Sequence, residues 1–365
     1  MSEYDLIDGH DSSHNEEIVN KWLNQMILRQ DNLNAPDALI CNDGKPLFGH
    51  FNGIPKKLAI GAFDYRTVMD KPASGLSKYF HYKQFQFVSI FTKRYVIGVA
   101  IADIRYLSSS FCYIYDVQED KLVEQTWLRP LHFGKGMSRS SYQGTAWIAN
   151  QKIQFHIRQG EWQVEIKTAN VTADLYLSGE DSSLPLSMCT PTGYSGWTYT
   201  QKHNALKLKG ILIVNGRPVD LEHALAGYDF SAGYMRRETS WRWASISAEI
   251  TGTTVGLNLA AGVNETGSCE NVVWINGERH LLGPVHFHFQ RDDINAIWRI
   301  TSESGQIDLQ FQPKNKRSEK LNLWLLKSNF RQFIGHFSGT VTDNTGQVHT
   351  LNNVLGLTED HFARW

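Results

Sequence analysis

The sequence predicts an all-β protein built from two consecutive antiparallel β-barrels that follow an N-terminal helix. From about residue 84 onward, apolar and polar residues alternate with a period of two in a dozen or more short segments. Short turns join these segments, and Asn215-Gly216 and Asn276-Gly277 are pairs that favour tight hairpins. Helical periodicity is almost absent after the first 30 residues. Antiparallel sheets of this size must close or stack to protect their edges, which predicts barrels.

The first part of the chain contains the one long helix that the sequence predicts. Ser13 and Glu16 have the spacing of a capping box, and apolar residues from Ile18 to Ile27 follow on one helical face. We therefore assign residues 1–35 to an N-terminal helical segment. Residues 36–185 form the first expected barrel, with alternating segments at 85–87, 111–115, 153–157, 162–166 and 171–177.

A stretch rich in Ser, Pro and Gly between residues 179 and 196 predicts the boundary between the two barrels, and residues 186–365 form the second. We also expect a short helix from Asp220 to Leu225, ended by Gly227. Strands are expected at 211–214, 241–250, 253–260, 272–275, 285–290, 296–301, 306–312, 321–326, 333–340 and 347–351.

Composition excludes several classes of function. The 365 residues include 36 Lys and Arg against 37 Asp and Glu, so the net charge of −1 argues against a nucleic-acid partner. With 41% hydrophobic and 12% aromatic residues, the chain can bury full-size cores. The acidic N-terminus does not resemble a signal peptide, and no apolar run reaches the roughly 20 residues of a membrane helix. Four scattered cysteines then predict buried free thiols in a cytoplasmic protein without an integral membrane segment.

The densest group of polar and aromatic residues runs from Gly227 to Trp243. Trp241 and Trp243 are two residues apart on an expected strand, so they share one face. A carboxylate beside such a face is partly desolvated, which raises its pKa and makes Asp229 a candidate general acid. The indole faces would stabilise a developing cation by about 0.5–2 kcal/mol each. The alternative is that Asp229 pairs with Arg236 or Arg237 while both indoles pack in a core.

Other polar clusters have weaker signals. His286 and His288 share a strand face, but neither a third ligand nor a metal or cofactor motif accompanies them, so we expect no metal and no cofactor. A second cluster either contributes polar groups to a cavity or shapes a loop; it consists of Asn258, Asn264, Glu265, Glu270 and Asn271.

From about residue 35 to the end, the chain resembles the family called domain of unknown function 2804. The resemblance rests on Asn34-Ala35-Pro36, Tyr228-Asp229-Phe230-Ser231-Ala232-Gly233, Trp241-Arg242-Trp243, Gly256-Leu257-Asn258-Leu259 and Glu359-Asp360-His361-Phe362-Ala363-Arg364-Trp365.

The order of hairpin, Asp, Gly and Trp-x-Trp is also distantly similar to the two-domain lipocalin-like proteins: carotenoid 1,2-hydratases, tocopherol cyclases and AttH-like proteins. That similarity implies two calycin-type barrels and, in the enzymes, an Asp that protonates a C=C bond of an isoprenoid. Those enzymes typically have Asp-x-x-Trp-Gly, whereas Ala232 occupies the tryptophan-like position here.

We therefore expect a hydrophobic small molecule, a lipid or an isoprenoid, to bind in a largely apolar barrel cavity at or between the domains. Asp229 is the candidate acid of a hydratase-, cyclase- or isomerase-like reaction. A carrier without chemistry and a carbohydrate-binding protein are the alternatives, and whether a reaction is catalysed stays open, as does the oligomeric state. The expected ligand-binding residues are Tyr228, Arg237, Trp241, Trp243, Asn258 and His286.

Overall fold

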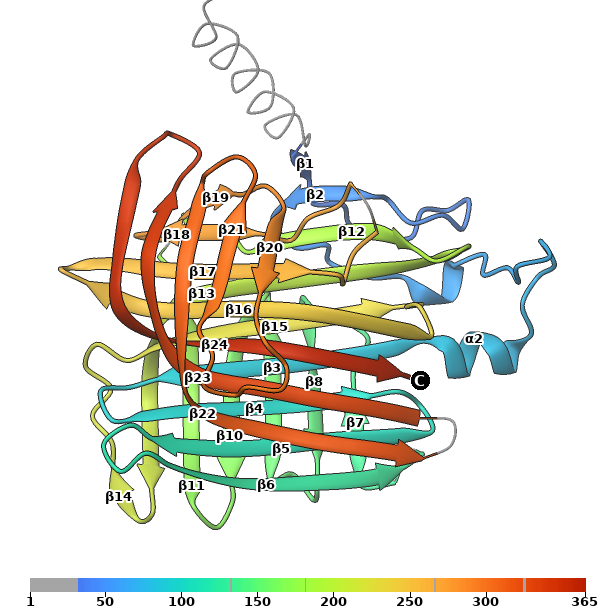
Figure 1. Cartoon of the computed structure of the whole chain (residues 1–365). Helices are drawn as coiled ribbons and strands as arrows, with labels where there is room; N and C mark the ends of the chain where they lie inside the picture. The colour runs from blue at the N-terminus through green and yellow to red at the C-terminus, as the bar shows by residue number, and fades with distance from the viewer. Residues whose placement is uncertain (1–31, 132, 181, 266, 324–325) are drawn as a thin grey trace, which may run out of the picture. The chain divides into compact units, whose positions relative to one another are not determined.

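The computed structural model describes residues 32–365 except 132, 181, 266 and 324–325, and it is almost entirely β-structure. The helix expected at residues 13–27 lies outside the described residues. Within them the structure has one α-helix, α2 (Gly75–His81), and one short 3₁₀ helix, η1 (Ile60–Ala62). The all-β prediction is confirmed: two curled sheets of barrel or half-barrel shape make up the described chain (Figure 1).

The first sheet has fifteen strands, and its main path runs in the order β6-β5-β4-β3-β15-β13-β11-β10-β9-β8-β7. Its pairings are antiparallel except for the parallel pair β1–β2. The strands are β1 (Asn32–Asn34), β2 (Gly49–Asn52), β3 (Lys83–Phe91), β4 (Tyr95–Asp103), β5 (Leu107–Asp116), β6 (Lys121–Pro130), β7 (Lys135–Met137), β8 (Gln143–Ile148), β9 (Ile153–Arg158), β10 (Glu161–Lys167), β11 (Val171–Ser178), β12 (Leu186–Thr192), β13 (Gly196–Val214), β14 (Arg217–Pro218) and β15 (Leu225–Gly233).

The second sheet has nine strands in the order β19-β18-β17-β16-β24-β23-β22-β21-β20. Both predicted Asn-Gly turns join neighbouring strands, one in each sheet. The strands are β16 (Glu238–Ile250), β17 (Thr253–Ala261), β18 (Val272–Ile275), β19 (Glu278–Leu281), β20 (Val285–His288), β21 (Trp298–Ser302), β22 (Ile307–Leu323), β23 (Leu326–Thr342) and β24 (Val348–Arg364).

The change from one sheet to the other occurs between Gly233 and Glu238, because residues 186–233 are hydrogen-bonded into the first sheet. Residues 32–365 form one compact unit, and the division into domains at residue 185 stays a prediction. The short helix expected from Asp220 is wrong. Residues 222–223 form a turn, and Leu225 starts strand β15, where it pairs with Phe91.

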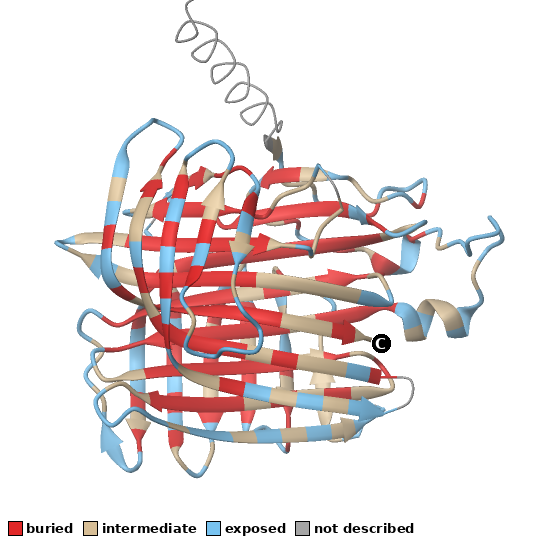
Figure 2. Cartoon of the chain, in the orientation of Figure 1, coloured by how far each residue is buried: buried red, intermediate tan, exposed pale blue. Residues whose placement is uncertain are grey.

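Each sheet has its own buried core, and a third cluster joins the two. Buried residues lie along the strands of both sheets (Figure 2). Alternating residues send one set of side chains, such as Val88 and Phe230, into the core of the first sheet. The opposite face of the same strands packs on the second sheet, where Phe87 meets Trp243 with ring centroids 5.9 Å apart. The interior of the first sheet is therefore filled by side chains, and its outer face supports the site described below.

A bulge in β13 fixes the two sheets to each other. The pairing register shifts between His203 and Leu206, and Ala205 has a φ of 58°. The bulge turns Asn204 toward the second sheet, where its Nδ2 donates to Ser245 Oγ at 3.0 Å and to the carbonyl oxygen of Leu257 at 2.6 Å. Because the Asn204 amide is buried, its two hydrogen bonds to the second sheet specify one relative position of the sheets.

The four cysteines are free thiols, of which Cys112 and Cys189 are buried, Cys269 is half-buried and Cys41 is exposed. The expectation of buried free thiols therefore fails at Cys41. Among the described residues, no helix has the length and apolar character needed to cross a membrane.

Candidate functional site

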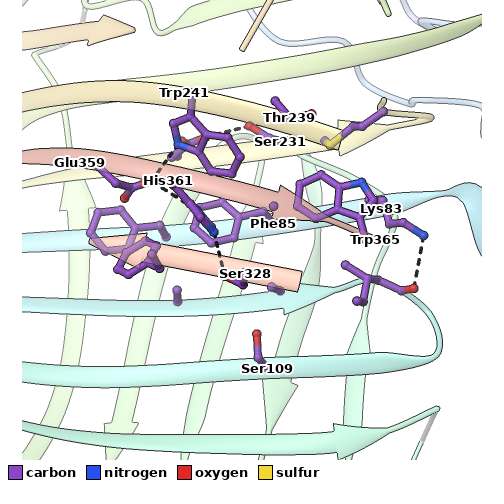
Figure 3. Close-up of a pocket in the computed structure, with 18 of the residues that line it drawn as sticks. Lys83, Phe85, Ser109, Ser231, Thr239, Trp241, Ser328, Glu359, His361 and Trp365 are labelled. Carbon is purple, nitrogen blue, oxygen red and sulfur yellow. Dashed lines mark hydrogen bonds and ion pairs between the residues drawn. The ribbon is translucent and has the colours of Figure 1, made fainter. Parts of the chain in front are cut away.

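A cavity of about 250 Å³ lies between the two sheets, against the outer face of the first (Figure 3). We expected a cavity within a barrel or between the domains. The structure has it between the sheets, because the alternating inward side chains fill the core of the first sheet. Its walls are mostly apolar, and the aromatic residues that line it are Phe85, Phe87, Phe111, Trp241, Trp243, Phe330 and Trp365.

Asp229 lines this cavity from the middle of β15, between β13 and β3. Its Oδ2 lies 2.9 Å from Lys202 Nζ, and its Oδ1 accepts a hydrogen bond from Ser231 Oγ at 3.0 Å. Lys202 faces Asp229 directly in the antiparallel register of the two strands, so the strand pairing itself positions the ion pair. The alternative in which Asp229 pairs with an arginine is wrong: Arg236 instead lies 3.6 Å from Glu265, and Arg237 is exposed.

A second carboxylate shares the same lysine. Glu270 Oε1 lies 3.2 Å from Lys202 Nζ, and both side chains are almost fully buried. Burial raises the pKa of Glu270, although the charge of Lys202 opposes this shift. Burial also disfavours the charged form of Lys202, but Asp229 and Glu270 outweigh it and raise the pKa of this lysine. Lys202 therefore remains a cation beside two carboxyl groups, and burial favours the protonated form of Glu270.

Trp243 and Asn258 support this buried cluster. Trp243 Nε1 donates to Asn258 Oδ1 at 2.7 Å, and Asn258 Nδ2 donates to the carbonyl oxygen of Glu270 at 2.7 Å. Lys202 Nζ lies 5.9 Å from the centre of the Trp243 ring, within the range of a cation–π contact. Asn258 is buried and sits behind the indole, so it orients a wall residue and is not itself part of the lining.

A second polar cluster faces the cavity from β16, β23 and β24 (Figure 3). Ser328 Oγ and His361 Nε2 are 2.9 Å apart, and His361 Nδ1 lies 3.7 Å from Glu359 Oε1. Glu359 also accepts hydrogen bonds from Trp241 Nε1 at 2.7 Å and from Gln332 Nε2 at 3.2 Å. The cluster combines a hydroxyl, an imidazole and a carboxylate in an apolar surrounding.

Arg317 closes one side of the cavity and connects the sheets. Its guanidinium lies 3.9 Å from the centre of the Phe111 ring and 4.9 Å from that of Phe330. The same side chain forms ion pairs with Glu124 of β6 at 2.7 Å and with Glu319 of β22 at 3.0 Å. A planar guanidinium suits this position, because it can stack on aromatic rings while its edge binds carboxylates.

Of the site residues expected from the sequence, Asp229, Trp241 and Trp243 line the cavity together. Three others point elsewhere. Tyr228 alternates with Asp229 on β15, so its ring faces the core of the first sheet and stacks on Trp162 at 4.7 Å.

Arg237 and His286 are the other two expected ligand-binding residues that do not reach the cavity. Arg237 is exposed in the connection between β15 and β16. His286 lies on the edge strand β20, where its side chain is 54% exposed and is 3.4 Å from Glu303. Neither residue lines the cavity, because neither lies on a strand face that the other sheet covers.

Sequence reasoning missed Lys202, Arg317, Ser328, Glu359 and His361. Glu359 and His361 carried a usable signal, since two residues apart on a strand they share a face. Glu270 was named within a cluster whose cavity and loop interpretations both stayed open; the structure puts its side chain in the cavity wall.

Among the described residues, no group of three or more His, Cys, Asp or Glu side chains is arranged to hold a metal ion. The rings of His286 and His288 lie 6.4 Å apart on β20, and both side chains are exposed.

Comparison with known proteins gives distant structural likenesses and one family. No curated protein matches the chain. A crystal structure of an AttH-type protein from Nitrosomonas europaea is similar with a TM-score of 0.46 and 12% identity, over 82% of this chain and 98% of that one. Kievitone hydratase from Nectria haematococca is similar with a TM-score of 0.43 and 12% identity, over 77% and 88%. The family model for a domain of unknown function, DUF2804, matches residues 30–365, so the chain belongs to that family.

Proposed function

We propose that the cavity between the sheets binds a hydrophobic small molecule, a lipid or an isoprenoid, and that the Asp229–Lys202–Glu270 cluster transfers a proton to it. The observation that carries this proposal is a buried lysine between two carboxyl groups, facing an apolar, aromatic-lined cavity. Few and convergent polar groups in an apolar cavity are typical of small-molecule sites.

Binding would be driven by the apolar walls. Transfer of apolar surface from water to such a cavity gains about 25 cal/mol per Å². The polar cluster would then fix the orientation of the ligand, since a mismatched polar group at Lys202 would remain unpaired at a cost of about 1–3 kcal/mol. The site therefore favours a mainly hydrocarbon ligand that has its reactive bond near Asp229.

The proton would reach the ligand through Asp229, and the protonated Glu270, which lines the same cavity and contacts the same lysine, would supply it to Asp229. Protonation of a C=C bond creates a carbocation and leaves a carboxylate. Lys202 stabilises that carboxylate, and the ring of Trp243 stabilises the cation by about 0.5–2 kcal/mol. Addition of water, ring closure or loss of another proton would complete a hydratase, cyclase or isomerase reaction.

A carrier without chemistry is the second candidate, because an ion pair at the cavity wall also suits anchoring of a polar end group. The structure does not support carbohydrate binding. Such binding required tryptophans on an open surface, whereas Trp243 is only 8% exposed.

The binding step is tested with cis-parinaric acid, a fluorescent polyene fatty acid. Ala102 lines the cavity, so Ala102→Phe should fill it and weaken binding at least tenfold. The matched control is Thr172→Phe, on an exposed position of β11, which should bind like the wild type. Equal binding by Ala102→Phe and the wild type would show that the probe does not enter this cavity.

The chemical step is tested by incubating the protein with a lipid extract in D₂O and following masses by chromatography. Wild-type protein should produce a deuterium-labelled product, because the transferred proton comes from exchangeable groups. Asp229→Asn should abolish the product while keeping cis-parinaric acid binding within about threefold. Label incorporation that persists in Asp229→Asn would refute the acid role, and binding without any product in the wild type would favour the carrier.

A further inference from the structure

The cavity holds a second reactive arrangement, apart from the ion cluster at Asp229. We propose that Ser328 is a nucleophile activated by His361 and Glu359, and that it hydrolyses carboxylic esters with an apolar acyl chain. The three side chains line the same cavity and come from the adjacent strands β23 and β24.

The geometry has the order of groups that nucleophilic catalysis needs. Ser328 Oγ lies 2.9 Å from His361 Nε2, within hydrogen-bond reach. On the other side of the ring, His361 Nδ1 lies 3.7 Å from Glu359 Oε1 and has no hydrogen bond within the described part of the chain. Catalytic hydrogen bonds are often long without substrate and shorten when it binds.

Packing holds the imidazole in this position. The ring of His361 lies 4.2 Å from that of Trp241 and 4.9 Å from that of Phe330, measured between ring centres. Glu359 is held in turn by the indole N–H of Trp241 and the amide of Gln332. An oriented base next to a hydroxyl is the arrangement by which serine, which is weakly nucleophilic alone, becomes reactive.

The cavity also offers a hydrogen-bond donor that a substrate oxygen could use. Trp365 lines the cavity, and its Nε1 atom is buried without an acceptor among the residues described. A buried donor without a partner costs about 1–3 kcal/mol, which a substrate oxygen would recover. Such donors are most effective where charge forms during the reaction.

The reaction balances with water as the only co-reactant. Ser328 Oγ bonds to the ester carbonyl carbon while His361 Nε2 takes the hydroxyl proton and then gives it to the leaving alcohol oxygen as the ester C–O bond breaks. Water next attacks the acyl-serine, His361 takes its proton, and that proton returns to Ser328 Oγ when the acyl bond breaks. The products are an alcohol and a carboxylic acid.

The test uses p-nitrophenyl esters of medium-chain fatty acids and an alkyl fluorophosphonate, followed by peptide mass spectrometry. We expect hydrolysis and a covalent adduct on Ser328. Ser328→Ala and His361→Ala should each lower kcat/KM by about 10²–10⁴-fold. The matched control is Ser338→Ala, at an exposed serine of the same strand, which should keep full activity.

Glu359→Gln tests the positioning role. It should lower kcat with little change in KM, because the imidazole loses the carboxylate that orients it, and Glu359→Asp should restore part of kcat. Absence of an adduct on wild-type Ser328, or hydrolysis that survives Ser328→Ala, would overturn the proposal. The adduct test needs only the wild-type protein, so it can refute the proposal even if a variant fails to fold.

Discussion

At the scale of single residues, the charge balance of the site depends on Lys202. Isolated buried charges are costly, and breaking a buried ion pair by removal of one partner typically costs about 3–5 kcal/mol. Here one lysine serves two carboxyl groups, at 2.9 Å and 3.2 Å, so a full complement of charges leaves one negative charge in excess. The cluster therefore favours uptake of one proton, and Glu270 is the residue where burial promotes it.

Glu270→Gln should change how stability depends on pH. The folded-state pKa of Glu270 is raised, so its contribution to stability is fully present below its unfolded value, near 4.5, and is lost as the pH rises. The free energy of unfolding of the wild type relative to Glu270→Gln should therefore fall as the pH rises above about 4.5, by at most about 1.4 kcal/mol per pH unit.

Urea unfolding of both proteins at several pH values measures this difference. Glu278→Gln, at an exposed position of β19, is the matched control and should show no such trend. A relative stability that is constant with pH, or that rises with it, would mean that Glu270 is not the proton-holding group.

At the scale of elements, the alternation of side chains explains how much of the fold and site the sequence predicts. Amphipathic strands such as β9, β10 and β11 are predictable because one face is buried and the other is solvated. In β13, only 211–214 was expected, whereas the strand starts at Gly196. Its first half is buried on both faces between the first core and the second sheet, and polar residues such as Lys202 there conceal the pattern.

The same alternation separates the predictable site residues from the others. The pairing of Trp241 with Trp243 needs only a period of two, and the prediction of a shared face is confirmed. The partnership of Asp229 with Lys202 depends on the register between two strand segments, neither of which was predicted from the sequence. Ser328 and His361 meet for the same reason, through the register of β23 and β24.

Gly256 tests the contact between β17 and the bulge of β13. A Cβ atom at this position would lie 2.9 Å from the backbone carbon of Asn204 and 3.0 Å from its Cβ. Gly256→Ala should therefore push the sheets apart and lower the free energy of unfolding by about 1–3 kcal/mol. Gly75→Ala is the control, because a Cβ at Gly75 meets no atom within 4 Å. Equal thermal unfolding of the two variants would exclude this contact as a determinant of sheet packing.

At the scale of the whole molecule, the cavity results from two sheets that already have cores of their own. Phe87 of the first sheet packs against Trp243 of the second, and Arg317 of the second sheet contacts Phe111 and Glu124 of the first. The space between them lies outside both cores. It can therefore hold polar and unpaired groups, such as Glu270 and Trp365 Nε1, that a protein core would exclude.

The high aromatic content of the chain is explained by where the aromatic residues lie. Many aromatics fill the two cores, and a smaller set lines the cavity between them. Three clusters of buried charge, around Lys202, Arg317 and Glu359, face this cavity, whereas others, such as the Asp103–Arg105 pair, lie outside it. A ligand that satisfies these clusters should be mainly apolar with few polar groups.

Native mass spectrometry of the protein purified from its own cells tests the central claim most directly. The account predicts a hydrophobic small molecule bound in a 1:1 ratio to the wild type and to Thr172→Phe, and lost from Ala102→Phe. A ligand-free wild type, or a bound molecule that Ala102→Phe retains in full, would contradict it.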